Sequence, residues 1–83
     1  MDKIQVMLEV PSVSKKYEME IPVHLKVKNL IPLLVQVIVE LTDGLYVSSG
    51  NEFLCASGRD ILLDEDSMVA YYDIKNGDHL MMI

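Results

Sequence analysis

The sequence predicts an α+β domain in which a mixed sheet of four to five strands packs on one main helix. Three features indicate it: two alternating segments at the N-terminus, one long apolar segment with polar residues at helical spacing, and short apolar segments after it. Eighty-three residues are enough for one domain, so residues 1–83 are expected to form a single unit. The hydrophobic fraction of 51% fits a chain that buries a core.

The first two strands are predicted from alternation with a period of two. The residues that share a face are Ile4, Val6, Leu8 and Val10 in the first segment, and Tyr17, Met19, Ile21 and Val23 in the second. The polar, turn-rich stretch 11–15 between them predicts a β-hairpin with a rather long connection. Pro22 cannot donate a ladder hydrogen bond, which fits the end of an edge strand.

The apolar segment 30–41 is predicted to be a helix, although its β-branched residues favour a strand by propensity. Polar or helix-breaking residues recur every three or four positions: Asn29, Pro32, Gln36, Glu40 and Asp43. On a helix they form one narrow solvent stripe. The opposite face then carries Leu30, Ile31, Leu34, Ile38 and Leu41. Asn29 is expected to cap the helix with Pro32 in its first turn, and Gly44 to end it.

The second half of the chain predicts short strands and turns. In order, these are a strand at Glu52–Ala56, a very short strand at Ile61–Leu63, a helical turn at Met68–Tyr71 capped by Asp66 or Ser67, a turn at Asn76–Gly77, and a final strand at Asp78–Ile83. Strands on both sides of one crossing helix indicate the β-grasp arrangement, with the last strand between the first and the third.

Several motifs carry a family resemblance. Residues 53–62 and 68–78 resemble the second half of ubiquitin. Val27-Lys28-Asn29-Leu30-Ile31 and the ending 73–83 resemble the small ubiquitin-like proteins of Gram-positive type VII secretion systems, the YukD-like group, except that the pair Tyr71-Tyr72 precedes the ending. The resemblance implies a ubiquitin-like β-grasp fold and an accessory role in type VII secretion, with membrane-anchored secretion components as protein partners.

The C-terminal sequence bears on two alternative functions. A covalent ubiquitin-like modifier or sulfur carrier needs a slender tail ending in Gly-Gly, whereas this sequence ends at Ile83 in an apolar run. A GTPase-binding β-grasp domain usually presents Arg and Lys on the edge of its second strand, where this chain has Glu18 and Glu20. A non-conjugating, non-covalent adaptor is therefore the preferred interpretation.

Composition and charge exclude several other classes. The net charge of -6 argues against nucleic-acid binding, and the apolar stretch 30–41 is too short and too polar for membrane insertion. The start Met1–Ile4 lacks the form of a signal peptide. Cys55 is the single cysteine, which rules out an intramolecular disulfide and fits a reducing compartment; whether it is redox-active stays open. These features fit an intracellular protein, and the resemblance to the YukD-like group implies a bacterial protein that a membrane-anchored partner recruits from the cytoplasm.

The sequence gives little basis for an enzyme. His24 and His79 have no clear partner for a Cys–His pair with Cys55, and a solvated loop explains the acidic residues 64–66 better than a metal site, because the glycine and terminal glutamate of an EF-hand are missing. We expect no enzymatic activity, no cofactor and no bound metal.

One face of the predicted sheet is the first candidate site. If Leu54, Leu80 and Met82 point into the core, alternation sends their neighbours outward. The expected protein-binding residues are Met7, Phe53, Cys55, His79 and Met81. Exposed aromatic and methionine side chains beside polar ones are typical of protein interfaces. The alternative is that Phe53 folds over the sheet edge and the others are scattered apolar residues.

The helix is the second candidate site. Leu33 and Val39 flank the polar stripe, so the sheet alone would leave them uncovered. They are expected to mark a groove for a partner or a surface for weak homo-oligomerisation. The alternative is that the connection 45–50 covers one of them.

Overall fold

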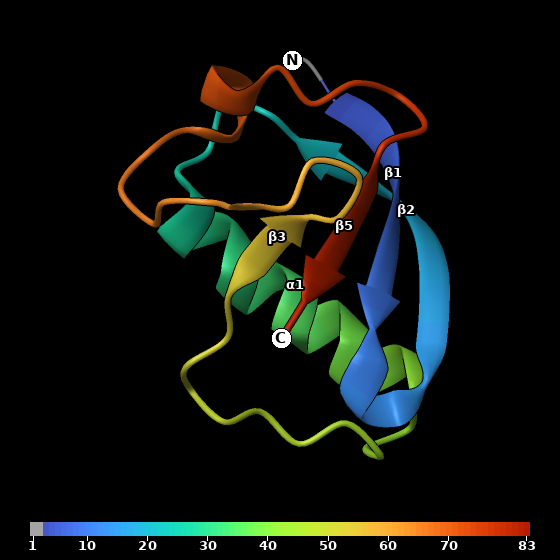
Figure 1. Ribbon diagram of the computed structural model, residues 1–83. Helices are drawn as coiled ribbons and strands as arrows, with labels where there is room; N and C mark the ends of the chain where they lie inside the picture. Colours follow the sequence, from blue (N-terminus) through green and yellow to red (C-terminus); the bar gives the residue numbers. More distant parts are fainter. Residues whose placement is uncertain (1–2) are drawn as a thin grey trace.

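The computed structural model describes residues 3–83; Met1 and Asp2, at the start of the expected leaderless N-terminus, lie outside the described residues. The elements are β1 (Lys3–Val10), η1 (Pro11–Val13), β2 (Lys15–Pro22), α1 (Val27–Leu41), β3 (Leu54–Ala56), β4 (Ile61–Leu62), η2 (Val69–Tyr72) and β5 (His79–Met82), where η is a 3₁₀ helix. The strands form a five-stranded sheet in the order β2-β1-β5-β3-β4, and α1 crosses one of its faces (Figure 1). The predicted β-grasp arrangement is confirmed.

The pairing of the strands places the first strand, β1, next to the last strand, β5, in the middle of the sheet. β1 runs antiparallel to β2 and parallel to β5, and β3 runs antiparallel to β5. Leu80 of β5 lies between Leu8 of β1 and Ala56 of β3. The last strand therefore sits between the first and the third, as the sequence predicts.

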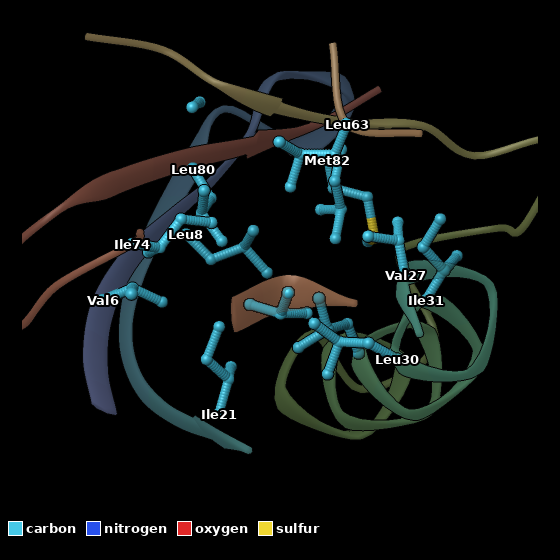
Figure 2. Close-up of a cluster of buried hydrophobic side chains, with 14 of the residues drawn as sticks. Val6, Leu8, Ile21, Val27, Leu30, Ile31, Leu63, Ile74, Leu80 and Met82 are labelled. Carbon is cyan, nitrogen blue, oxygen red and sulfur yellow. The ribbon is translucent and has the colours of Figure 1, made fainter. Parts of the chain in front are cut away.

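The core lies between the sheet and α1. Figure 2 shows Leu8, Leu80 and Met82 of the sheet directed towards the helix residues Val27, Leu30 and Ile31. Leu54 of β3 and Leu80 of β5 are fully buried, and Met82 of β5 is 2% exposed. The predicted inward direction of these three side chains is confirmed. The period-two alternation is what sends the residues between them to the other face.

The start of α1 differs from the prediction. The helix begins at Val27 with Lys26 as its N-cap and without a side-chain capping bond, so Asn29 is not the cap and Pro32 lies in the second turn. The N–H of Val27 donates to the carbonyl of Ser67 at 2.9 Å, and the N–H of Lys28 donates to that of Glu65 at 3.0 Å. Backbone from another segment thus satisfies donors that a capping side chain would otherwise satisfy.

The end of α1 matches the prediction in part. Thr42 is the C-cap, and Asp43, with φ +54°, is the first left-handed residue after it. Gly44 follows with φ +82°, and its N–H donates to the carbonyl of Val39 at 2.9 Å, so the expected glycine takes part in ending the helix one position later. Leu41, however, was expected on the buried face and is 54% exposed. That prediction is wrong because Leu41 is the last residue of α1, beyond Ile38, the last buried residue of the helix.

The helical turn before the last strand also has an unexpected cap. η2 begins at Val69 with Met68 as its N-cap and no side-chain capping bond, so neither Asp66 nor Ser67 caps it. The N–H groups of Val69 and Ala70 donate instead to backbone carbonyls of the 23–25 segment, at 3.0 and 2.9 Å. The segment before α1 and the segment around η2 therefore cap each other.

The turn before β5 contains a glycine, Gly77, whose conformation can be tested by substitution. Gly77 has φ +89°, its N–H donates to the carbonyl of Gln5 at 2.8 Å, and the N–H of Gln5 donates to Oδ1 of Asn76 at 2.8 Å. A Cβ on Gly77 would meet no heavy atom within 4 Å, so the cost of Gly77→Ala comes from holding an alanine at a positive φ and not from a clash. We expect its free energy of unfolding, measured in urea, to fall by about 1 kcal/mol.

Gly58→Ala is the matched control for this test. Gly58 also has no neighbouring atom within 4 Å of a Cβ, but its φ lies outside the left-handed region. Its free energy of unfolding should therefore stay the same or rise. Equal losses in both variants would show that the conformation of Gly77 does not cause the effect.

Candidate functional site

The outer face of the sheet brings the predicted binding residues together. Met7 of β1 lies opposite His79 of β5, and Met81 of β5 lies opposite Cys55 of β3. Just before β3, Phe53 exchanges two backbone hydrogen bonds with Ile83, at 2.8 and 2.9 Å. The five residues thus come from three adjacent strands and the residue just before β3, and they share the face opposite to α1.

These five side chains differ in their exposure. Phe53 is 44% exposed and His79 is also exposed, whereas Met7, Cys55 and Met81 are half-buried between their neighbours. All five point away from the core, because each alternates with a buried residue. The outward direction agrees with the sequence analysis, and the binding role of these residues stays a prediction.

Two further apolar residues extend this face. Leu62 of β4 lies opposite Cys55 and is 58% exposed, and Ile83 is 62% exposed beside Phe53. We define the outer apolar patch as Phe53, Cys55, Leu62, Met81 and Ile83. A hollow of about 330 Å³ opens in it, lined by Cys55, Ser57, Asp60, Ile61, Leu62 and Met81. Sequence reasoning missed Leu62 because its place depends on the pairing of a two-residue strand.

Polar residues border the patch on the side of β1 and β2. Glu9 lies opposite Met81, and Glu18 lies opposite Met7. The imidazole of His79 adds a polar group on β5, and the hydroxyl of Ser57 adds another on the side of β3. The backbone N–H of Ser57 donates to the carbonyl of His79 at 3.1 Å. An apolar centre with a polar margin is the usual composition of a protein-binding surface.

The helix residues of the second candidate site do not meet. Leu33 is 49% exposed, whereas Val39 is half-buried and packs against the core. Six positions apart, they lie about 120° from each other around the helix. In the connection after α1, Tyr46 is buried and Val47 is 82% exposed. Leu33 therefore belongs to a different side of α1 from Val39.

A buried polar cluster holds the connection between α1 and β3. Oε2 of Glu52 accepts hydrogen bonds from the hydroxyl of Tyr46 at 2.8 Å, from the hydroxyl of Ser48 at 2.6 Å and from the N–H of Ser49 at 3.1 Å. Glu52 is buried, and the sequence analysis placed it in a strand instead. An acidic residue near two serines is too common a pattern to have revealed this cluster.

The cluster shifts the pKa values of both its acidic groups. Burial raises the pKa of Tyr46 to about 12, and the hydrogen bond to Glu52 and the negative charge of Glu52 act in the same direction. For Glu52, burial acts to raise the pKa, but the hydrogen bonds from Ser48, Tyr46 and backbone amides outweigh it and hold the pKa below its ordinary value. The hydrogen bonds of the cluster therefore hold the connection in place and favour the ionised form of Glu52.

Along residues 3–83, no group of three or more His, Cys, Asp and Glu side chains is placed to hold a metal ion. Among the helices of the same range, none combines the length and the apolar character that crossing a bilayer requires.

Comparisons with known proteins agree with this geometry. The family model described as "WXG100 protein secretion system (Wss), protein YukD" matches residues 4–82. No curated protein matches the sequence.

Solved structures resemble the fold over the whole chain. The ubiquitin-like domain of the Mycobacterium tuberculosis type VII secretion system protein EccD1 superposes with a TM-score of 0.79 at 14% identity, covering 100% of this chain and 99% of that one. The EccD5 ubiquitin-like domain from Mycobacterium xenopi gives 0.81 at 12% identity, with 100% and 94% covered. A ubiquitin-like domain from Arabidopsis thaliana gives 0.68 at 20% identity, with 100% and 78% covered. At these identities the likeness establishes the ubiquitin-like fold.

Proposed function

Because the chain belongs to the YukD family of the WXG100 protein secretion system, we propose that residues 1–83 act as one ubiquitin-like domain, a non-catalytic adaptor of that system. In this proposal it docks non-covalently on another secretion component. A membrane-anchored component would recruit it from the cytoplasm to the membrane. The named type VII secretion proteins among the similar structures support this setting, since they carry a domain of the same fold.

The outer apolar patch is the observation that carries the proposal. Its residues come from β3, β4, β5 and the segments next to them, and they gather on the face that α1 does not cover. Exposed aromatic side chains that fill a pocket of the partner contribute much of the binding energy of many interfaces. In this proposal Phe53, 44% exposed, is such an anchor, and the hollow lined by Cys55 and Met81 takes a side chain of the partner.

The proposal is tested by Phe53→Glu. The charge is placed on the large aromatic side chain of the patch, so we expect capture of secretion components from the native cell to fall by about tenfold or more. The measurement is a tagged pull-down read by mass spectrometry, with circular dichroism of the purified variant. Because the Phe53 side chain is 44% exposed, the variant should keep the native spectrum.

Tyr71→Glu is the matched control, since it introduces the same charge at another exposed aromatic residue, 77% exposed and outside the patch. It should leave capture unchanged. An unfolded Phe53→Glu variant would mean that Phe53 supports the core, and undiminished capture would remove the patch from the proposal. Partners that stay attached under denaturing conditions would indicate a covalent modifier instead of a docking adaptor.

A further inference from the structure

The hollow in the outer apolar patch has a mixed lining. Its polar lining residues are Ser57 and Asp60, both in the turn between β3 and β4. Its apolar lining residues come from β3, β4 and β5: Cys55, Ile61, Leu62 and Met81. The volume of about 330 Å³ is at the lower end of the range of small ligand sites, so there is room for one long side chain. What the hollow binds therefore depends on two polar groups set between apolar walls.

Both polar side chains offer hydrogen-bond acceptors to an incoming group. Asp60 is exposed, and a carboxylate accepts hydrogen bonds without donating any. The hydroxyl of Ser57 donates to the carbonyl of His79 at 3.3 Å, which leaves the Ser57 oxygen to accept a further bond. Lysine and arginine side chains have the opposite character, since they carry donors and a positive charge and no acceptor. The polar lining is therefore complementary to a basic side chain.

The chain does not neutralise Asp60 itself. Within residues 3–83, no hydrogen bond or ion pair engages the Asp60 carboxylate. The neighbouring cation, Arg59, is used elsewhere: one guanidinium nitrogen donates to the carbonyl of Tyr72 at 2.8 Å, and the other lies 4.0 Å from Oδ2 of Asp78. Arg59 and Asp78 line a separate hollow. Asp60 therefore places an uncompensated negative charge beside the apolar walls.

The margin of the patch on the side of β1 and β2 has the same sign. Lys16 lies opposite Glu9, which in turn lies opposite Met81, so one cation faces one carboxylate in this row. In the next row Glu18 lies opposite Met7, and among the described residues it has no ion-pair partner. The net charge of -6 adds a long-range attraction for a positively charged partner. Negative charge on both sides of an apolar centre favours a partner surface whose apolar residues stand next to basic ones.

We propose that the hollow binds a lysine or arginine side chain of the docking partner. The aliphatic stem lies along the apolar walls, and the charged end reaches the carboxylate of Asp60 and the hydroxyl oxygen of Ser57. This inference rests on the proposed docking function. It adds the chemical class of the partner surface, in which a basic side chain stands beside the pocket that takes Phe53.

Two probes separate the charge from the stem. Nα-acetyl-lysine amide carries a charged side chain, and Nα-acetyl-norleucine amide carries a similar stem without the charge. Each is titrated into the full, isotope-labelled chain, and the backbone amide signals are followed by NMR. The lysine probe should shift the signals of Cys55, Asp60 and Leu62 and bind at least about threefold more tightly than the norleucine probe, as expected for one exposed charge pair. Equal binding of the two probes would overturn the proposal and make the hollow a site for an apolar side chain.

Asp60→Asn removes the charge and keeps the size of the side chain. Asp60 has φ +52°, a conformation that asparagine also adopts readily, so the turn should keep its structure. The variant should lose the preference for the lysine probe. Glu40→Gln is the matched control, because it removes one negative charge at an exposed position of α1, on the other face of the sheet. Equal losses in both variants would mean that net charge and not the hollow causes the preference, and the proposal would fall.

Capture of secretion components tests the same contact with the partner. Asp60→Asn should lower capture from the native cell by about threefold to tenfold, and added salt should weaken capture by the unchanged chain, because it screens the charge pair. If Phe53→Glu lowers capture and Asp60→Asn does not, the docking function stands and the basic side chain is wrong. If Phe53→Glu leaves capture unchanged, the docking face is wrong, and the probe titration still decides whether the hollow prefers a basic side chain.

Discussion

Leu80→Ala is expected to lower the free energy of unfolding by about 2–5 kcal/mol. Leu80 is fully buried in β5, with Leu8 on one neighbouring strand and Ala56 on the other. Because Ala56 is already small, the surrounding side chains have little means to fill the space that the truncation leaves. The measurement is equilibrium unfolding in urea, followed by circular dichroism.

His79→Ala is the control for Leu80→Ala, since it truncates the preceding residue of the same strand on the opposite face. His79 is exposed, so its loss should change the free energy of unfolding by no more than about 0.5 kcal/mol. A large loss of stability for His79→Ala, together with a small loss for Leu80→Ala, would mean that His79 faces the core and Leu80 faces outward. The outer apolar patch would then have to be redefined.

Glu52→Ala is expected to destabilise the fold by about 1–3 kcal/mol, because it leaves the buried hydroxyl of Tyr46 without its acceptor. It also removes the acceptor of Ser48 and Ser49, so the connection between α1 and β3 should lose protection against hydrogen exchange. Glu52→Gln keeps an acceptor oxygen and should lose less. Equal stability of the alanine variant and the unchanged chain would show that the cluster contributes nothing.

The pKa shifts give this cluster a pH signature. The folded-state pKa of Glu52 lies below the ordinary value of 4.5, so its stabilising effect is present above that pH and is lost as the pH falls through the folded-state pKa. The folded-state pKa of Tyr46 is raised to about 12, so its contribution is present below pH 10 and is lost as the pH rises towards 12. Urea unfolding across pH should show a shallower acid limb in Glu52→Gln.

Local patterns predicted the elements of the fold. The alternation in β1 and β2 and the three-to-four spacing of polar residues in α1 are properties of neighbouring residues, so they are visible in the sequence. The element ends were harder to predict. α1 starts two residues before Asn29, and η2 is not capped by Asp66 or Ser67, because the partners of their first N–H groups come from segments about 40 residues away.

The candidate site also contains some residues that local patterns predict and others that only the tertiary structure reveals. Phe53, Cys55 and Met81 could be assigned to the outer face from alternation alone. The same alternation sends Ile83 outward, whereas Leu62 could not be assigned, since its place depends on which strand lies next to β3. The burial of Glu52 depends on the loop after α1, which folds around the Glu52 carboxylate. The exposure of Leu41 depends on how far the sheet extends under the helix. Such features need the tertiary structure.

The central place of β5 has a consequence for the newly synthesised chain. β5 is synthesised after the other four strands of this sheet, yet it separates β1 from β3 and contributes Met81 to the patch. An incomplete chain can form the first hairpin and the helix but cannot complete the sheet, and pairing across most of the chain length is a slow step in folding. The outer apolar patch is therefore complete only once β5 has entered the sheet, and a chain that lacks β5 does not form it.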